Sequence, residues 1–392
     1  MADLFQSQKL GDAVVLKNRI VMPPMTRTRT SEGELPTDGD LPNEMIATYY
    51  GQRAGAGLII SEATDVEQSS HGYARTPGIH SEAQMRGWRL VTDEVHRQGG
   101  TIFMQLWHVG RMAHSSILPN GQMPVGATAE QAVGSSVFAH GPDGRLGYMP
   151  ADKPRALSTD EVSAMVGTFA KAAANARKVG FDGVELHAAN GYLIEQFMNS
   201  VLNTRTDRYG GGSMEDRTRF LMEVVDAVVA ECGPGRVGVR LSPFGTFNSM
   251  PKEPLAEETF LYVAEQLGRR GVAYIHLLYE LMPEGNMETA TFKPHYLDHS
   301  LIARAREVFP GAMIWCGGFN DRERAQEALD TGLVDLIAFG RPYIGNPDLV
   351  ERLQNGWPLH VADRSTYYTR NGEVGFTDFP TYRDTSPSPV AA

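Results

Sequence analysis

Residues 158–187 read "STDEVSAMVGTFAKAAANARKVGFDGVELH", and this stretch contains the repeating unit of the whole chain. Its first four letters form a capping box, the serine and glutamate pair that begins a helix, and a helical pattern continues to about Lys178. The run Gly183–His187 is continuous rather than alternating, which is typical of a strand buried on both faces. The stretch therefore predicts a helix that leads into a buried parallel strand.

Seven other short apolar runs have the same character, and longer helical patterns separate them: Arg19–Met25, Gly57–Glu62, Thr101–Trp107, Val237–Ser242, Ala273–Leu278, Ala312–Cys316 and Val334–Phe339. Repeated strand–helix alternation indicates a parallel sheet. Eight such strands fit a closed barrel better than an open sheet, so we expect an α/β protein with a (β/α)8 TIM barrel. Barrels of this size often fold as one unit, and we expect a single domain over residues 1–392.

The segments outside these units predict what covers each end of the barrel. The stretch "DLFQSQKLGDAVVLKNR" before the first strand predicts a small N-terminal hairpin under the barrel's bottom. Two long connections, residues 108–154 and 280–296, follow the third and sixth strands. Loops after barrel strands lie at the catalytic mouth, and loops of this length are usually lids or binding loops. Two further helix starts are predicted, one capped by Ser213 and one by Asn346 with Pro347 in its first turn, the latter stopping at Gly356.

Residues 233–238, "GPGRVG", match the glycine pattern of dinucleotide-binding folds. That pattern must follow a strand and open a helix, whereas here a helix ends before the glycines and a strand begins after them. We therefore interpret these glycines as a helix stop and a turn.

Composition narrows the class of partner. The net charge is −11 and the basic residues are scattered, which argues against a nucleic-acid surface or an anionic membrane surface. No run approaches the roughly 20 apolar residues of a membrane span, and the first residues lack a signal-peptide pattern. The two cysteines, Cys232 and Cys316, cannot form a metal site by themselves and fit a reducing compartment. We expect a cytoplasmic protein without a metal, as a monomer or homodimer, acting on a small molecule.

Polar and small residues gather where the predicted strands end. Glycines after strands 7 and 8 would let backbone N–H groups approach a phosphate, and an arginine adds charge: Gly317, Gly318, Gly340 and Arg341. Thr26, Gln105 and Arg240 could bond the polar edge of a flat heterocycle. Spacing alone leaves open that Arg240 is only salt-bridged and that Gln105 only fills a barrel layer. Strand 4 ends in "HAANGY", which places two hydrogen-bond donors, His187 and Asn190, beside the phenol of Tyr192.

Five stretches together closely resemble the Old Yellow Enzyme family of FMN-dependent ene-reductases: "HAANGYLIEQFMNSVLNTRTDRYGGGSMEDRTRF", "LKNRIVMPPMTRTR", "FMQLWHVGR", "GVRLSPFGTFNSM" and "LIAFGRPYIGNPDL". The resemblance runs from about Leu4 to Tyr382. It implies a barrel that binds FMN without a covalent bond and accepts electrons from NADPH or NADH. It also implies electrophilic alkenes as substrates, with nitro compounds and quinones as further acceptors.

The resemblance further implies roles for single residues. Those around the flavin ring would be Pro24, Thr26, Ala63, Gln105, Arg240 and Tyr367, and those around its phosphate Gly318, Gly340 and Arg341. His187 and Asn190 would bind the substrate oxygen, Tyr192 would donate the proton, and Trp107, Phe247 and Tyr368 would shape the substrate pocket. Two alternatives remain open from the residues: another FMN barrel that oxidises a substrate such as a dihydropyrimidine, and a flavin-free isomerase or lyase acting on a phosphorylated sugar.

Overall fold

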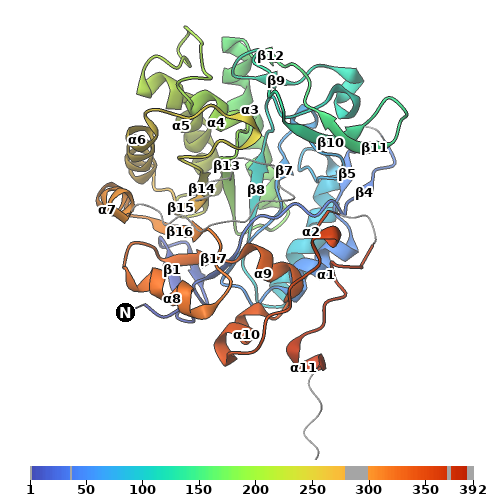
Figure 1. Ribbon diagram of the computed structural model, residues 1–392, viewed down its shortest axis with the longest axis vertical. Helices are drawn as coiled ribbons and strands as arrows, with labels where there is room; N and C mark the ends of the chain where they lie inside the picture. Colours follow the sequence, from blue (N-terminus) through green and yellow to red (C-terminus); the bar gives the residue numbers. More distant parts are fainter. Residues whose placement is uncertain (1, 36–37, 279–298, 369–371, 386–392) are drawn as a thin grey trace, which may run out of the picture.

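The computed structural model describes residues 2–35, 38–278, 299–368 and 372–385, and its centre is a closed barrel of parallel strands (Figure 1). In chain order the barrel strands are β3 (Ile20–Met22), β6 (Leu58–Ile60), β8 (Ile102–Trp107), β13 (Gly183–Ala188), β14 (Val237–Leu241), β15 (Tyr274–Leu278), β16 (Ala312–Cys316) and β17 (Leu336–Ala338). Each strand pairs in parallel with the next, and β17 pairs with β3 to close the ring. The predicted (β/α)8 barrel is therefore confirmed, and each of its strands falls within or close to a predicted apolar run.

Helices cover the outside of the barrel: α1 (Glu44–Gln52), α2 (Glu82–Arg97), α3 (Thr159–Lys178), α5 (Met214–Cys232), α6 (Ala256–Arg269), α7 (His299–Val308), α8 (Arg322–Asp330), α9 (Gly340–Gly345) and α10 (Leu349–Asn355). Ser158 and Glu161 form the predicted capping box of α3, and Ser213 caps α5. Gly233, with φ 85°, ends α5 before β14 begins, so the glycine-rich stretch is the predicted helix stop and turn. Across the described ranges, no helix combines the length and the apolar character needed to cross a bilayer.

Asn346 is not the helix cap that the sequence predicts, and this prediction is wrong. The N-cap position of α10 is occupied by Asp348. The Asn346 amide instead donates to the carbonyl oxygens of Pro342 and His360 at 2.8 and 2.9 Å, and its oxygen accepts the His360 N–H at 2.8 Å. An asparagine before a proline can either cap a helix or bind the backbone of another segment, and only the tertiary contacts decide which of the two occurs. The predicted stop at Gly356 is confirmed by its left-handed backbone, with φ 65°.

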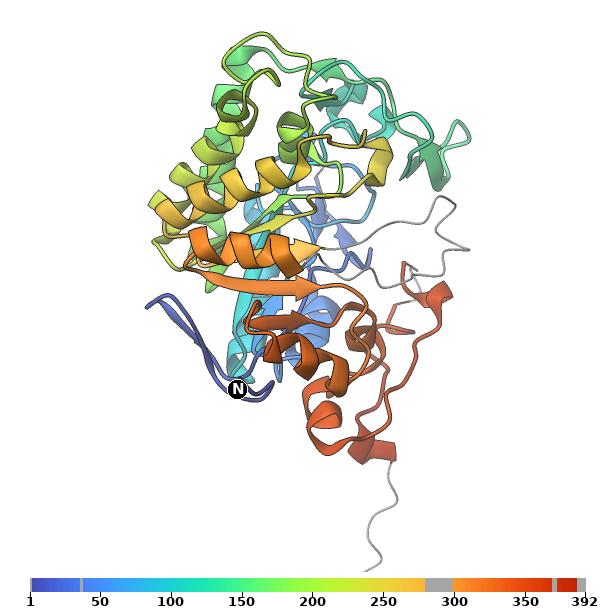
Figure 2. The same ribbon diagram turned by 60° about the vertical axis from the view of Figure 1, so that its left-hand side comes forward.

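The amino-terminal end of the barrel is closed by apolar packing. The strands β1 (Gln8–Leu10) and β2 (Val14–Leu16) form the predicted antiparallel hairpin, which lies at the end of the barrel away from the strand tips (Figure 2). Leu10 and Leu16 are fully buried in one cluster with side chains from the strands above them: Val21, Leu58, Ile60, Phe103, Tyr274, Ile314 and Leu336. The hairpin therefore serves as the bottom of the core.

The opposite end carries the long connection after β8. It contains a short strand β9 (Val125–Gly126) and a hairpin of β10 (Ser136–His140) and β11 (Leu146–Pro150), and β9 pairs in parallel with β12 (Arg155–Ala156). Val137 and Ala139 of the hairpin belong to a buried cluster with Trp107 and Tyr192. The predicted lid over residues 108–154 thus packs against the strand ends. The second predicted lid, residues 280–296, lies outside the described residues.

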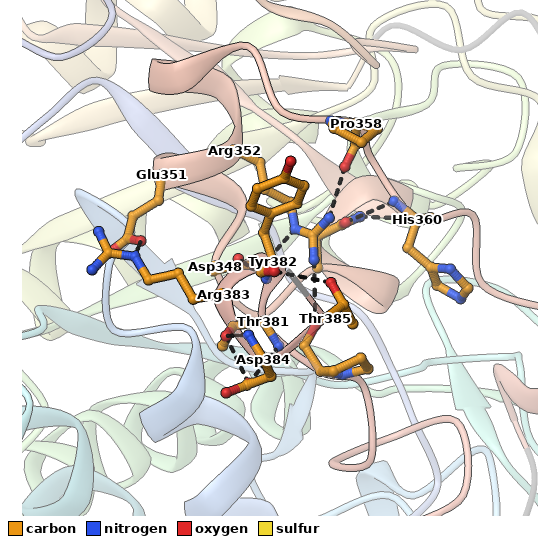
Figure 3. A network of polar contacts seen from close by, with 12 residues as sticks. Asp348, Glu351, Arg352, Pro358, His360, Thr381, Tyr382, Arg383, Asp384 and Thr385 are labelled. Carbon is orange, nitrogen blue, oxygen red and sulfur yellow. Dashed lines mark hydrogen bonds and ion pairs between the residues drawn. The ribbon is translucent and has the colours of Figure 1, made fainter. Parts of the chain in front are cut away.

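The C-terminal segment folds back onto α10 (Figure 3). The Arg352 guanidinium donates to Asp348 Oδ1 and to the carbonyl oxygen of Pro358, both at 2.7 Å. The backbone N–H of Tyr382, the first residue of the short helix α11 (Tyr382–Thr385), donates to Asp348 Oδ2 at 2.7 Å. The Tyr382 ring stacks on Trp357 with ring centroids 4.4 Å apart. These contacts fix the chain that follows the barrel.

Candidate active site

The upper part of the barrel interior is lined by polar side chains, in contrast to its apolar bottom. The strand register places Gln105 opposite Glu185, and Arg240 between His187 and His276. All five side chains are buried. Because each comes from a strand, their positions are fixed by the barrel and not by loops.

Glu185 is the centre of a buried hydrogen-bond network that the sequence analysis missed. Its carboxylate accepts from Gln105 Nε2 at 2.8 Å and from His276 Nδ1 at 2.8 Å. Glu185 and His276 have no exposed side-chain surface. The signal was present in the sequence, since each is a polar residue inside an otherwise apolar strand. Gln105 does fill a barrel layer, as the alternative interpretation held, but its amide oxygen remains oriented by the bond that its nitrogen makes.

Several buried nitrogen atoms at this end have no hydrogen-bond partner within the described residues, among them Arg240 Nε, His187 Nδ1, His276 Nε2 and Trp107 Nε1. Buried polar atoms are hydrogen-bonded in the large majority of cases, because leaving one unpaired costs about 1–3 kcal/mol. Several unpaired polar atoms at one end of a barrel, Arg240 Nε and Trp107 Nε1 as donors among them, therefore indicate the place of a polar ligand. These atoms could bond the polar edge of a heterocycle.

The rim residues leave room for a phosphate beside the backbone. A Cβ atom added to Gly340 would meet nothing nearer than Pro23 Cγ at 3.8 Å, and one added to Gly318 nothing nearer than Arg324 Nη1 at 3.9 Å. Gly318 has φ +67°, a conformation that favours glycine. Gly317 precedes it at the end of β16, and Arg341 follows Gly340 with an exposed side chain. The structure thus brings the glycines after strands 7 and 8 to the same end of the barrel as the unpaired nitrogens.

The loop after β3 contributes Pro24 and Thr26, both partly buried, and Ala63 follows β6. The next arginines in this loop are buried and bind backbone carbonyls of the C-terminal segment. Arg27 donates to the carbonyls of Tyr367 at 3.0 Å and Gly375 at 2.8 Å. Arg29 donates to the carbonyl of Thr366 at 2.9 Å. These bonds hold Tyr367 and Tyr368 close to the loop of Thr26, a link that nothing in the sequence pattern indicated.

His187 and Tyr192 lie against each other and against Trp107. The ring centroids of His187 and Tyr192 are 4.9 Å apart, and those of Trp107 and Tyr192 are also 4.9 Å apart. Burial, followed by the positive charge of Arg240, holds the pKa of His187 well below its ordinary value. The imidazole is therefore neutral, with one N–H to donate.

The phenol of Tyr192 is kept protonated by its surroundings. Burial raises its pKa, and hydrogen bonds with the side chains of Tyr73 and Asn248 only partly offset this effect. Tyr73 comes from the loop after β6, and its ring stacks on Trp107 with centroids 5.8 Å apart. Asn248 lies in the short helix η4 (Phe247–Ser249), next to the predicted pocket residue Phe247. Neither residue was predicted from the sequence: Tyr73 lies outside the quoted motifs, and Asn248 lies within "GVRLSPFGTFNSM" but received no role there.

A buried polar layer and a rim of open glycines at the carboxyl ends of parallel barrel strands are typical of barrel enzymes that bind a phosphate-bearing ligand. The model of the NADH:flavin oxidoreductase / NADH oxidase family matches residues 3–360. The chain is 42% identical over 382 residues to 12-oxophytodienoate reductase 1 of Oryza sativa subsp. japonica, covering 96% of this chain and 92% of that protein.

Two solved structures are similar to this one throughout. Morphinone reductase superposes with a TM-score of 0.89 at 42% identity and covers 99% of both chains. The Old Yellow Enzyme homologue from Zymomonas mobilis superposes with a TM-score of 0.85 at 40% identity, covering 96% of this chain and 99% of that one. The chain belongs to the Old Yellow Enzyme family of FMN-dependent oxidoreductases. The resemblance identified from its motifs is confirmed.

Proposed function

We propose that this protein reduces the carbon–carbon double bond of α,β-unsaturated carbonyl compounds, with nitroalkenes, nitroesters and quinones as further acceptors, at the expense of NADPH or NADH. The observation that carries the proposal is at the end of β13, where a neutral histidine and a protonated tyrosine lie against each other. Morphinone reductase has been solved in complex with tetrahydroNAD, which supports a nicotinamide as the reductant.

FMN would be held without a covalent bond by the residues around the mouth. Thr26, Gln105 and Arg240 would bond the ring, and Pro24, Ala63 and Tyr367 would line it. Because Glu185 engages Gln105 Nε2, the amide oxygen of Gln105 is left to accept from a ring N–H. Gly317, Gly318, Gly340 and Arg341 would surround the phosphate. When bound, FMN supplies the hydride that it has received from the nicotinamide.

His187 and Asn190 would bind the substrate oxygen and stabilise the negative charge that develops there as hydride reaches the β-carbon. Two preorganised donors in a buried site act as an oxyanion hole does, and each is typically worth about 3 kcal/mol in the transition state. Neutral imidazole suits this role because it donates without adding a net charge. Trp107, Phe247 and Tyr368 would bound the pocket and orient the alkene.

Tyr192 would supply the proton to the α-carbon. Hydride at the β-carbon and a proton at the α-carbon together add two hydrogens and two electrons, and the tyrosinate then regains its proton from water. The raised pKa of Tyr192 keeps the phenol protonated before the reaction and makes the tyrosinate a strong base afterwards.

Purified protein should be yellow, and heat should release free FMN and not FAD. Stopped-flow reoxidation of the reduced protein by a panel of enones, nitroesters and quinones would then rank the acceptors. A colourless protein that cannot be reconstituted with FMN would contradict the cofactor assignment. A yellow protein whose reduced form is reoxidised by quinones but by no enone would contradict the proposed roles of His187, Asn190 and Tyr192.

A further inference from the structure

The turn that carries Asn190 has an unusual backbone. Asn190 and Gly191 both adopt left-handed conformations, with φ 61° and 76°. A Cβ atom on Gly191 would lie 2.7 Å from the carbonyl oxygen of Phe247 and 2.8 Å from Met250 Cγ. A left-handed non-glycine residue costs free energy and persists only where its surroundings hold it in place. The contacts that hold this turn therefore decide where the Asn190 amide points.

Side chains bind both backbone polar groups of Asn190. Its N–H donates to Ser242 Oγ at 2.9 Å, and its carbonyl oxygen accepts from Asn248 Nδ2 at 2.8 Å. Ser242 is buried just after β14, and Asn248 is buried in η4. These two hydrogen bonds thus hold the Asn190 turn to the connection that follows β14, the strand next to β13.

Side chains of the next helix, α4 (Leu193–Met198), bind both backbone polar groups of Gly191. Its N–H donates to Glu195 Oε2 at 2.5 Å, and its carbonyl oxygen accepts from Gln196 Nε2 at 2.8 Å. The second oxygen of Glu195, Oε1, accepts from Ser242 Oγ at 2.7 Å. The Glu195 carboxylate therefore holds Gly191 directly and Asn190 through the hydroxyl of Ser242.

We propose that Glu195 is a positioning residue for the substrate-oxygen site: its carboxylate, acting through Gly191 and Ser242, fixes the direction in which the Asn190 amide donates. This inference rests on the proposed function, because it concerns the donor assigned to the substrate oxygen. An ionised carboxylate accepts at both oxygens and so satisfies both donors at once. A protonated carboxyl group carries a hydrogen on one oxygen, so one of the two contacts is lost or reversed.

The setting of Glu195 makes its ionisation sensitive to pH near neutrality. Burial raises the pKa of the Glu195 carboxyl group to about 7. It borders a cavity of about 50 Å³ that Glu253 also borders. Glu253 accepts instead from the backbone N–H and the hydroxyl of Ser200, at 2.5 and 2.8 Å. Two arginines also face these elements: Arg217 donates to the hydroxyl of Thr259, which lines the cavity, at 2.8 Å, and Arg111 donates to the carbonyl oxygens of Asn248 and Ser249 at 3.3 and 2.8 Å.

Glu253 provides a matched control, because it is a glutamate at the same cavity that does not contact the turn. The experiment uses FMN-loaded protein and titrates para-chlorophenol, whose oxygen would bind between His187 and Asn190, by its long-wavelength charge-transfer absorbance. Glu195→Gln should raise the Kd for the phenol about tenfold, the equivalent of one good hydrogen bond, with FMN still bound. Glu253→Gln should leave the Kd within about twofold.

A double-mutant cycle with Asn190→Ala separates positioning from general loosening of the site. If Glu195 acts through Asn190, Glu195→Gln should change the Kd less than about twofold in the Asn190→Ala background. Both proteins bind the same phenol, so the ratio of the Kd of Glu195→Gln to the Kd of the parent is independent of the phenol's own ionisation. That ratio should rise as pH increases through about 7, because only the parent gains the carboxylate form over this range.

Several outcomes would overturn the inference. A parent-like Kd in Glu195→Gln, or an equal loss in Glu253→Gln, would mean that the carboxylate does not position Asn190. A full tenfold effect in the Asn190→Ala background would mean that Glu195 acts on another group. If Glu195→Gln does not retain FMN, Ser242→Ala is tested by the same criteria, because it removes the hydroxyl that joins Glu195 to Asn190 while the Glu195–Gly191 bond stays in place. A parent that binds FMN but no phenol would contradict the proposed oxygen site itself, and the inference with it.

Discussion

The two ends of the barrel are built from the same strands but bury opposite kinds of side chain. On β8, Phe103 packs into the apolar cluster above the N-terminal hairpin, and two residues later Gln105 bonds a buried carboxylate. On β15, the Tyr274 ring belongs to the apolar cluster, and two residues later His276 Nδ1 bonds the same carboxylate at 2.8 Å. Two residues along a strand therefore separate an apolar layer of the core from a polar layer.

This difference indicates which end supplies stability and which end supplies function. Apolar burial stabilises the fold by about 25 cal/mol per Å² of buried surface. Unpaired buried donors have the opposite effect, because each costs about 1–3 kcal/mol until a ligand pairs with it. Substitutions at the mouth should therefore change binding and rates with little loss of stability, and substitutions at the bottom should do the reverse.

The largest effect is expected for Tyr192→Phe. The variant lacks the proton for the α-carbon, and loss of a general acid typically costs about 10² to 10⁴ in rate. Reduction of the bound flavin by the nicotinamide needs no proton from the phenol and should persist within a small factor. Single-turnover kinetics with cyclohexenone and with a quinone, after anaerobic reduction, would measure the separate steps.

Quinone reduction is the internal control for Tyr192→Phe. Its protons go to oxygen, where water can compete, so it should fall less than enone reduction. An equal fall in nicotinamide oxidation and enone reduction would instead mean that Tyr192 maintains the shape of the site. An undiminished enone rate would show that the proton comes from another source.

The sequence predicts those features of the barrel that depend on residues close together in the chain. Apolar runs located the strands, and the capping box at Ser158 and the stop at Gly233 mark helix ends because those signals act within a few residues. The bond between Glu185 and His276 was not predictable, since it joins two strands whose register no local pattern specifies. The same holds for Glu195 and Ser242, which meet only because β13 and β14 are neighbours.

The next largest effect is expected for His187→Ala. Removing one oxyanion donor typically lowers the rate by about 10² to 10³, and here it should weaken phenol binding as well as enone reduction. FMN should remain bound, because His187 is assigned to the substrate and not to the cofactor. His187→Asn, which restores an N–H donor, should recover part of the loss. Parent-like phenol binding in the alanine variant would remove His187 from the oxygen site.

At the other end of the barrel, Leu16→Ala should lower the free energy of unfolding. Leu16 is fully buried beneath the strands, and a Leu→Ala change in a core costs about 2–5 kcal/mol. We expect a value near 2 kcal/mol, because a terminal hairpin can move and partly fill the cavity that the substitution creates. Urea unfolding would measure this loss, and kcat for the folded enzyme should stay within about twofold. A fall in kcat without a loss of stability would contradict the division between the two ends.

The smallest effect is expected for Thr26→Ala, which tests a single proposed hydrogen bond at the site end of the barrel. The Thr26 hydroxyl would donate to a ring carbonyl on which negative charge accumulates as the flavin is reduced. A net hydrogen bond of about 1 kcal/mol that favours the reduced form corresponds to about 20 mV for a two-electron couple. The variant should therefore have a lower flavin potential, measurable by dye equilibration, and a rate of reduction by NAD(P)H lower by less than about tenfold.

Thr28→Ala is the matched control, because the buried Thr28 hydroxyl donates to the carbonyl of Arg27 at 2.8 Å in the same loop. An unchanged potential and unchanged rates in Thr26→Ala would remove Thr26 from the flavin site, and an equal shift in both variants would show that only the loop had been disturbed.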